Sequence, residues 1–261
     1  MRWLSRISVS VLLIFSVSGF AAVTEKKVQL PNQLGSAVIY GNDSIKNQGT
    51  GVIVIHEWWG FNDYARSRAK MLAELGYTSI AVDMYGTGKV ADHPDNAMAF
   101  MEEAMKDPEK INARFEAAMA LLKAESGVDA SRIYAMGYCF GGGVVLNQAR
   151  MGKNLAGVAS FHGMLTSKKF KADATTLKAK ILVAHGGADP FVPPEQASSF
   201  VTEMLGAGAD LDFRVYPGVK HSFTVPEATA KGEAFGMPFK YDEYADKDSW
   251  AALLRMLEQK S

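Results

Sequence analysis

The sequence predicts an α/β domain built on a mostly parallel, doubly wound sheet with helices on both faces. Short runs rich in β-branched residues alternate along the chain with longer segments of helical spacing. Several of the short runs are apolar almost throughout, as strands are when both faces of a parallel sheet are covered. This alternating order of elements is typical of an open sheet enclosed between two layers of helices.

The periodicity assigns each element a range. We expect strands at Ser36–Tyr40, Gly51–His56, Thr78–Val82, Arg132–Met136, Gly157–Phe161, Lys180–His185 and Leu211–Tyr216. We expect helices at Asp63–Leu75, Pro94–Met105, Pro108–Glu125, Gly141–Met151, Pro194–Leu205 and Asp248–Gln259. Asp63 is the expected N-cap of the first helix, and Gly76 follows that helix where a terminating glycine belongs. Residues Pro226–Asp246 lack periodicity, so we expect a long connection near the rim of the sheet.

Composition limits the class of protein and of partner. The chain has 261 residues, 48% of them apolar, with 28 basic and 28 acidic side chains. These values are typical of a globular domain that buries a full core. The absence of a basic excess argues against a nucleic-acid partner. We expect a monomer that acts on a small uncharged or mixed-charge molecule without a cofactor.

The first residues have the order of a secretory signal. Arg2 and Arg6 precede an uncharged run, Ile7–Phe20, and small residues at Gly19 and Ala21 follow the −3, −1 pattern of a cleavage site. The run of 14 residues is shorter than the roughly 20 needed to cross a bilayer, which disfavours an uncleaved anchor. We therefore expect a signal peptide at residues 1–21, with Ala22 as the alternative cleavage position. A single domain at 22–261 would then be exported to the periplasm, without stable membrane insertion.

Cys139 is the only cysteine, so the chain forms no internal disulfide. A lone cysteine is often a buried structural residue, but its neighbours here favour a different interpretation. The predicted strand ending at Met136 runs into Gly137-Tyr138-Cys139-Phe140-Gly141, and a helix follows. This is the nucleophile elbow of an α/β-hydrolase with a thiol in place of the usual hydroxyl. The following helix N-terminus favours the reactive thiolate.

An elbow enzyme needs an acid and a histidine later in the chain, in that order. Asp189 follows the apolar strand Lys180–His185, and His221 follows the strand Leu211–Tyr216. Both fall at the carboxyl edge of the sheet, where active sites of open α/β sheets gather. Asp189 would orient the imidazole of His221, which would move the proton of the nucleophile.

The other four histidines have competing explanations. His56 and His185 end apolar strands, where we expect them to pack in turns, and His93 lies in a polar helix start, where we expect it to be solvated. His162 follows a strand end and is expected to line the substrate pocket. No His-x-x-x-His or paired-cysteine spacing is present, so we expect no metal site.

With these three positions in order, the chain from about Ser36 onward resembles the dienelactone hydrolase family of α/β-hydrolases. The resemblance rests on five segments in combination: His56-Glu57-Trp58-Trp59-Gly60, Asp83-Met84-Tyr85-Gly86, Gly137-Tyr138-Cys139-Phe140-Gly141-Gly142, His185-Gly186-Gly187-Ala188-Asp189 and His221-Ser222-Phe223. Phe235-Gly236-Met237-Pro238, leading toward Trp250, resembles the family's rim loop and final helix.

The resemblance implies further roles. Glu57 would contact the cysteine and help to generate the thiolate, and the backbone N–H groups of Trp58 and Phe140 would form an oxyanion hole. Trp59, Tyr85, Lys89, His162 and Phe223 would contact the substrate. Family members that act on dienelactone clamp its carboxylate with two arginines, whereas this chain has Gly86-Thr87-Gly88-Lys89 and Thr224-Val225 at those places. Lysine supplies a charge without the bidentate fork, so dienelactone itself is disfavoured.

We therefore expect a carboxylic-ester or lactone hydrolase that works through a Cys139-His221-Asp189 triad and an acyl-thioester. Two other functions remain open. A single activated thiol in an oxidising compartment would suit an exported peroxide-sensing or detoxifying protein, although no resolving cysteine is present. The second alternative is a protein that binds a small molecule without catalysing a reaction.

Overall fold

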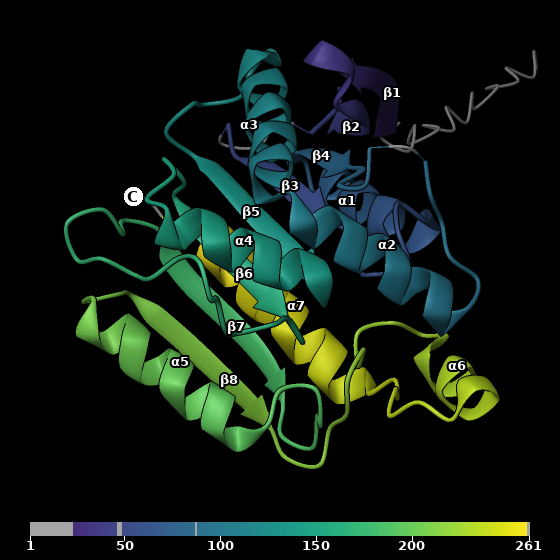
Figure 1. Cartoon of the computed structure of the whole chain (residues 1–261). Coiled ribbons are helices and arrows are strands. Elements are labelled where there is room, and N and C mark those ends of the chain that lie inside the picture. Colours follow the sequence, from purple (N-terminus) through teal and green to yellow (C-terminus); the bar gives the residue numbers. More distant parts are fainter. Residues whose placement is uncertain (1–22, 46–48, 87, 260–261) are drawn as a thin grey trace, which may run out of the picture.

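An eight-stranded sheet forms the centre of the molecule, with strand order β1-β2-β4-β3-β5-β6-β7-β8 (Figure 1). The computed structural model describes residues 23–45, 49–86 and 88–259; the expected signal peptide lies outside them. The strands are β1 (Val23–Leu30), β2 (Gly35–Asn42), β3 (Gly51–Ile55), β4 (Thr78–Val82), β5 (Ile133–Tyr138), β6 (Gly157–Phe161), β7 (Lys180–Gly186) and β8 (Leu211–Tyr216). From β4 to β8 every pairing is parallel, so the predicted α/β fold with a mostly parallel sheet is confirmed.

The sequence did not predict β1. This strand pairs antiparallel with β2 in a hairpin that runs from Val23 opposite Asn42 to Leu30 opposite Gly35. A short 3₁₀ turn, Pro31–Gln33, joins the two strands. Most of β1 is exposed and charged, which suits an edge strand that must not pair with another chain. The apolar pattern that marks a buried strand is therefore absent from it.

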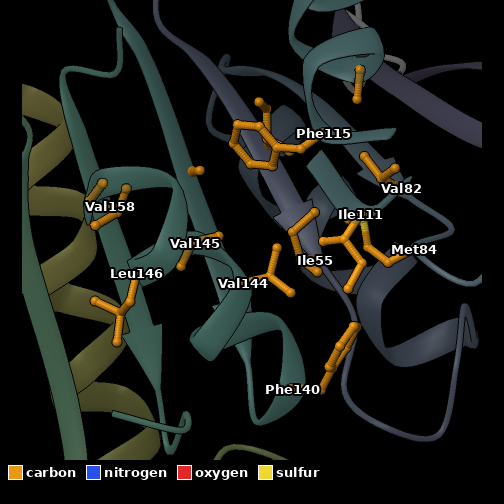
Figure 2. Packing of buried hydrophobic residues seen from close by; sticks show 14 of the residues in the cluster. Ile55, Val82, Met84, Ile111, Phe115, Phe140, Val144, Val145, Leu146 and Val158 are labelled. Atoms are coloured by element: carbon orange, nitrogen blue, oxygen red, sulfur yellow. The ribbon is translucent and has the colours of Figure 1, made fainter. Parts of the chain in front are cut away.

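Helices cover both faces of the sheet. They are α1 (Asp63–Glu74), α2 (Pro94–Lys106), α3 (Pro108–Ala124), α4 (Phe140–Arg150), α5 (Pro194–Gly206), α6 (Ala228–Phe235) and α7 (Glu243–Glu258). One core cluster unites apolar residues of α2 to α5 with one face of the sheet, and a second unites α1 and α7 with the other face. Figure 2 shows the first cluster, in which Phe140, Val144 and Val145 of α4 pack near Ile55 of β3. This packing fixes the start of α4, where the elbow lies.

The structure corrects several boundaries and caps. Asn62, not Asp63, is the N-cap of α1, because its side chain accepts a hydrogen bond from the N–H of Ala65. His93 is not merely solvated: it caps α2 by accepting from the N–H of Asp95, and its ring lies 5.2 Å from that of Phe235.

The stretch predicted as an irregular connection, Pro226–Asp246, contains α6 and the first turn of α7. In α6 only Ala228 and Gly232 are buried, so the helix carries no apolar stripe that a periodicity search could detect. Asp242 caps α7 by accepting from the N–H of Ala245 at 2.9 Å.

No helix in residues 23–45, 49–86 and 88–259 combines the length and apolar character that crossing a bilayer requires. The same ranges hold no group of three or more His, Cys, Asp or Glu side chains arranged to bind a metal ion.

Candidate active site

Cys139 stands at a strained turn between β5 and α4. Its backbone has φ 51° and ψ −113°, an unusual conformation for a residue with a side chain, and α4 begins at the next residue, Phe140. The thiol is partly exposed. A nucleophile elbow has this strand–turn–helix geometry, which lifts the side chain clear of the sheet.

The flanking glycines permit the turn. A Cβ atom on Gly137 would lie 2.2 Å from the carbonyl oxygen of Gly141, and one on Gly141 would lie 2.6 Å from that of Ile55. Both distances are far below van der Waals contact, so any side chain at these positions would push the strand and the helix apart. The N–H of Gly141 also donates to the carbonyl of His56 across 3.2 Å, which ties the start of α4 to the end of β3.

Asp189 and His221 meet beside this turn. His221 Nδ1 and Asp189 Oδ2 are 2.7 Å apart, and both side chains are buried. The other carboxylate oxygen of Asp189 accepts from the N–H of Phe191 at 2.9 Å, which fixes the orientation of the carboxylate. His185, which precedes the Asp189 turn, is buried against Phe213, as expected for a packing residue.

The surroundings of His221 favour its protonated form. Burial by itself lowers the pKa of His221, but the charge of Cys139, hydrogen bonds with Asp189 and Cys139, and the charge of Asp189 together raise it to about 10. The imidazole therefore interacts with the thiol on one side and with the carboxylate on the other. Three residues distant in sequence form one connected unit.

Glu57 follows the last residue of β3 by two positions and is 2% exposed. The hydroxyl of Ser222 donates to its carboxylate at 3.0 Å. The contact with Cys139 that the resemblance implies stays a prediction. Burial raises the pKa of Glu57, and the charge of His221 and the Ser222 bond counteract that rise. Glu57 also lines a cavity of 620 Å³ together with Tyr64, Arg68 and other residues of α1 and of the segment before α7.

The two positions expected to form an oxyanion hole flank the site. Phe140 is the first residue of α4, and the first N–H groups of a helix have no acceptor within it. Trp58 lies in the loop after β3, and its carbonyl accepts from the Tyr85 hydroxyl at 2.8 Å. Burial, and next the proximity of Cys139, raise the pKa of Tyr85, so this ring lies near the thiol.

Aromatic side chains surround His221. The rings of Phe191 and Phe239 lie 5.0 Å and 5.8 Å from its imidazole, and Phe239 also contacts Trp58 and Trp59. Phe191 is 44% exposed, which is unusual for a large apolar residue beside a buried histidine. Sequence reasoning missed Phe191 and Phe239. Phe191 lies two residues after Asp189, which was a usable signal, but nothing local linked Phe239 to the site.

Three of the residues expected to contact the substrate, Lys89, Phe223 and His162, are engaged in other contacts. The ammonium of Lys89 pairs with Glu103 at 2.8 Å and lies over the ring of Phe100, in a hollow between α2 and α3. Phe223 is fully buried in the core beneath α7, since its position in the loop turns the side chain inward. His162 is buried as well, with its ring centre 5.0 Å from that of His221.

Comparisons with known proteins agree with this geometry. The model of the dienelactone hydrolase family matches residues 36–261. Protein usf of Aquifex pyrophilus is 30% identical over 67% of this chain and 77% of its own length.

Two solved structures superpose closely. One is a dienelactone hydrolase-like promiscuous phosphotriesterase from metagenomic libraries, P91, with TM-score 0.81, 30% identity and coverage of 90% of this chain and 98% of its own. The other is m3DLH, with TM-score 0.82, 31% identity and coverage of 91% and 98%. The fold, the order of the site residues and the family match agree, and the chain belongs to the dienelactone hydrolase family of α/β-hydrolases.

Proposed function

We propose that this hydrolase cleaves small carboxylic esters or lactones, with Cys139 as nucleophile, His221 as general acid and base, and Asp189 as the residue that orients the imidazole. The observation that carries the proposal is the 2.7 Å contact of His221 with Asp189, on a ring that also interacts with Cys139 at a nucleophile elbow. The order along the chain, nucleophile, acid, histidine, is that of the α/β-hydrolases.

The reaction follows from these roles. His221 accepts the Sγ proton, and the thiolate of Cys139 attacks the carbonyl carbon. The backbone N–H groups of Trp58 and Phe140 stabilise the oxyanion. When the intermediate collapses, the C–O bond breaks, the leaving alcohol takes the proton from His221, and an acyl-thioester remains. Water then gives a proton to His221 and attacks the thioester, and the released thiolate regains a proton.

Glu57 has a supporting role in this proposal. Its burial raises its pKa, so it can hold a proton more readily than an exposed carboxyl group. The family resemblance makes it the group that promotes formation of the thiolate when substrate arrives, and its bond with Ser222 keeps it next to the loop that carries His221.

The surroundings favour an uncharged substrate. Lys89, the charge that could replace a carboxylate-binding arginine, is engaged with Glu103. The side chains next to His221 include the apolar rings of Phe191 and Phe239. An ester or lactone that carries an apolar or aryl group suits the rings of Phe191 and Phe239 better than a substrate that carries a carboxylate does.

The order of residues 1–21 supports export of the mature domain, residues 22–261, to the periplasm, and we propose that this domain is a monomer. Expression of the full chain in a bacterium, osmotic-shock fractionation and N-terminal sequencing test this proposal, and size-exclusion chromatography tests the monomer. A mature N-terminus at Ala22 or Val23 in the released fraction is expected. A full-length protein retained with the membranes would contradict it.

A substrate panel tests the activity. Short acyl esters, aryl esters and lactones are assayed with the wild type, Cys139→Ala and Cys139→Ser, and a phosphotriester is included because of the similarity to P91. We expect ester or lactone hydrolysis, and a loss of at least about a thousandfold in kcat for Cys139→Ala. Mass spectrometry should find an acyl adduct on the peptide that contains Cys139.

Three outcomes would overturn the proposal. Full activity in a folded Cys139→Ala variant would show that Cys139 is not the nucleophile. Absence of hydrolysis in the wild type, combined with loss of thiol labelling after mild peroxide, would favour an exported thiol-reactive protein. Ligand binding without turnover or thiol chemistry would favour a binding protein.

A further inference from the structure

His162 lies directly beneath the imidazole of His221. The two ring centres are 5.0 Å apart at an angle of 68°, and His162 is buried with its backbone at φ 39°, a left-handed conformation that restricts its placement. Burial lowers the pKa of His162 well below its usual value, and the charge of His221 lowers it further. A neutral imidazole therefore packs edge-to-face against one that favours its charge.

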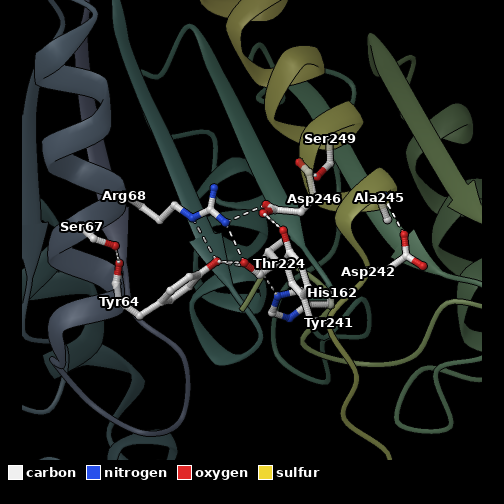
Figure 3. A network of polar contacts seen from close by, with 10 residues as sticks. All are labelled: Tyr64, Ser67, Arg68, His162, Thr224, Tyr241, Asp242, Ala245, Asp246 and Ser249. Carbon is white, nitrogen blue, oxygen red and sulfur yellow. Dashed lines mark hydrogen bonds and ion pairs between the residues drawn. The ribbon is translucent and has the colours of Figure 1, made fainter. Parts of the chain in front are cut away.

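A chain of hydrogen bonds runs from Arg68 of α1 to His162 (Figure 3). Arg68 Nε donates to the hydroxyl of Tyr64 at 3.2 Å, and that hydroxyl donates to Thr224 Oγ1 at 2.7 Å. Thr224 Oγ1 lies 2.9 Å from His162 Nε2. Four side chains from α1, the loop after β8 and the end of β6 are thus connected in series.

The donors in this chain point in one direction. A guanidinium can only donate, so the oxygen of Tyr64 accepts from Arg68 and gives its single hydrogen onward. Thr224 offers two acceptors for it, Oγ1 at 2.7 Å and the carbonyl oxygen at 3.0 Å; Oγ1 is the closer one, and the carbonyl already accepts from Arg68 Nη2. With Tyr64 donating to Thr224 Oγ1, the hydroxyl hydrogen of Thr224 is left for His162 Nε2. The neutral ring of His162 then carries its proton on Nδ1, an atom for which the described residues offer no hydrogen-bond partner.

The start of the chain is anchored between two helices. Arg68 Nη2 pairs with Asp246 of α7 at 2.6 Å, and both side chains are largely buried. The same nitrogen donates to the carbonyl of Thr224 at 2.7 Å. Thr224 lies three residues after His221, so Arg68 and Tyr64 of α1 bond both oxygens of a residue in the loop that carries His221.

We propose that His162 is a positioning residue for His221, and that Arg68, Tyr64 and Thr224 set its tautomer and fix the loop from His221 to Thr224. The proposal rests on the proposed function for its kinetic consequence, but the tautomer is a property of the protein without substrate. A ring whose Nε2 accepts from Thr224 cannot rotate freely, and it supports the face of His221 while Asp189 holds Nδ1 of that histidine.

Five titratable groups lie around His221 and influence its pKa, so each of them contributes to the pH profile of kcat. Cys139 faces the ring from the start of α4, Asp189 from the loop after β7, and Glu57 from the loop after β3. His162 and His185 approach from β6 and β7. The variants below leave all five in place.

Thr224→Val tests the kinetic consequence. Valine keeps the shape, and Tyr64 can turn its hydrogen to the backbone carbonyl at position 224, 3.0 Å away; only the donor to His162 is removed. We expect kcat for the best ester to fall about tenfold, as for a small misplacement of a reacting group, with KM within about twofold. Thr224→Ser keeps the hydroxyl and should recover most of the lost kcat. Tyr64→Phe removes the hydroxyl that fixes the direction of the hydrogen bonds, so it should lower kcat in the same way.

Ser79→Ala is the matched control, because it removes another buried hydroxyl, one that donates to the backbone carbonyl of Ala69 at 2.7 Å and is not a member of this chain of hydrogen bonds. Its kcat should equal that of the wild type even if its stability falls. Equal kcat and pH profile in the wild type, Thr224→Val and Tyr64→Phe would overturn the positioning role.

Imidazole ¹⁵N NMR of the substrate-free protein separates failure of this inference from failure of the proposed function. We expect His162 as the neutral Nδ1–H tautomer in the wild type and Thr224→Ser, and a tautomer mixture in Thr224→Val. An Nε2–H ring in the wild type overturns the inference whatever the activity. The expected tautomer in a protein that hydrolyses no ester would overturn the proposed function alone.

Discussion

Ser222 joins the loop of His221 to the end of β3 by donating its hydroxyl hydrogen to the carboxylate of Glu57 across 3.0 Å. The two residues are 165 positions apart in the sequence, and both are buried. Ser222 adopts φ 56°, a left-handed conformation that turns its side chain toward Glu57. The bond offsets part of the cost of burying a carboxylate near His221.

Ser222→Ala should destabilise the protein by about 1–3 kcal/mol at neutral pH, because a buried carboxylate loses a hydrogen bond. The Ser222 bond lowers the pKa of Glu57, so its loss should matter less at a pH at which Glu57 is protonated. Urea denaturation at pH 5 and pH 8 measures the difference. Ser79→Ala is the control, because the wild-type Ser79 hydroxyl donates to a neutral carbonyl and the stability lost with it should not vary with pH. Equal pH dependence in both variants would contradict the prediction.

His221 should make the free energy of unfolding depend on pH. Its folded-state pKa of about 10 lies above the usual 6.5, so its stabilising effect is complete below pH 6.5 and is lost as the pH rises toward 10. Cys139→Ala removes one of the interactions that raise this pKa and should flatten the decline, as should Asp189→Asn. Urea denaturation of the three proteins at pH 6.5 and pH 10 checks this, and parallel declines would count against the unit of Cys139, His221 and Asp189.

Gly137→Ala should cost about 3 kcal/mol or more, or prevent folding, because its Cβ would lie 2.2 Å from the carbonyl oxygen of Gly141. Gly206→Ala is the matched control, since a Cβ at this helical glycine meets nothing within 4 Å. That variant should be neutral or more stable by up to about 1 kcal/mol. Thermal denaturation of both variants is sufficient, and a stable Gly137→Ala protein would show that the elbow tolerates a side chain.

Phe191→Ala should weaken binding of aryl esters selectively. Loss of an aromatic contact is worth roughly 0.5–1.5 kcal/mol, which corresponds to about a two- to twelvefold higher KM for a phenyl ester. The KM for the matching methyl ester should change little. Leu205→Ala, which truncates a 61% exposed leucine on α5, serves as control, and an equal effect on both esters would mean that Phe191 does not contact the leaving group.

Lys89→Met should leave kcat/KM for uncharged esters within about twofold of the wild type, since a surface ion pair contributes little. Its ammonium is held by Glu103 and lies over Phe100. Steady-state kinetics with a neutral ester and with a carboxylate-bearing lactone measure the effect. A large loss with the lactone alone would restore Lys89 as a substrate-binding residue.

The sequence by itself determined the features that a few neighbouring residues decide. Gly137 and Gly141 flank Cys139 because the sharp turn excludes side chains there, so the elbow could be recognised from its local pattern. Apolar runs such as that of β3 reveal strands buried on both faces. Asp189 and His221 could be placed at the same edge as Cys139 because parallel strands end together.

Tertiary structure decided what depends on packing between distant elements. Local patterns could not tell that His162 lies beneath His221, that Glu57 bonds Ser222, or that Lys89 pairs with Glu103. Each contact is set by how loops from different strands and helices approach one another, and those approaches follow from the packing of the two cores on the sheet. The edge strand β1 and helix α6 escaped prediction for a related reason. Neither carries the apolar periodicity that burial imprints on a sequence.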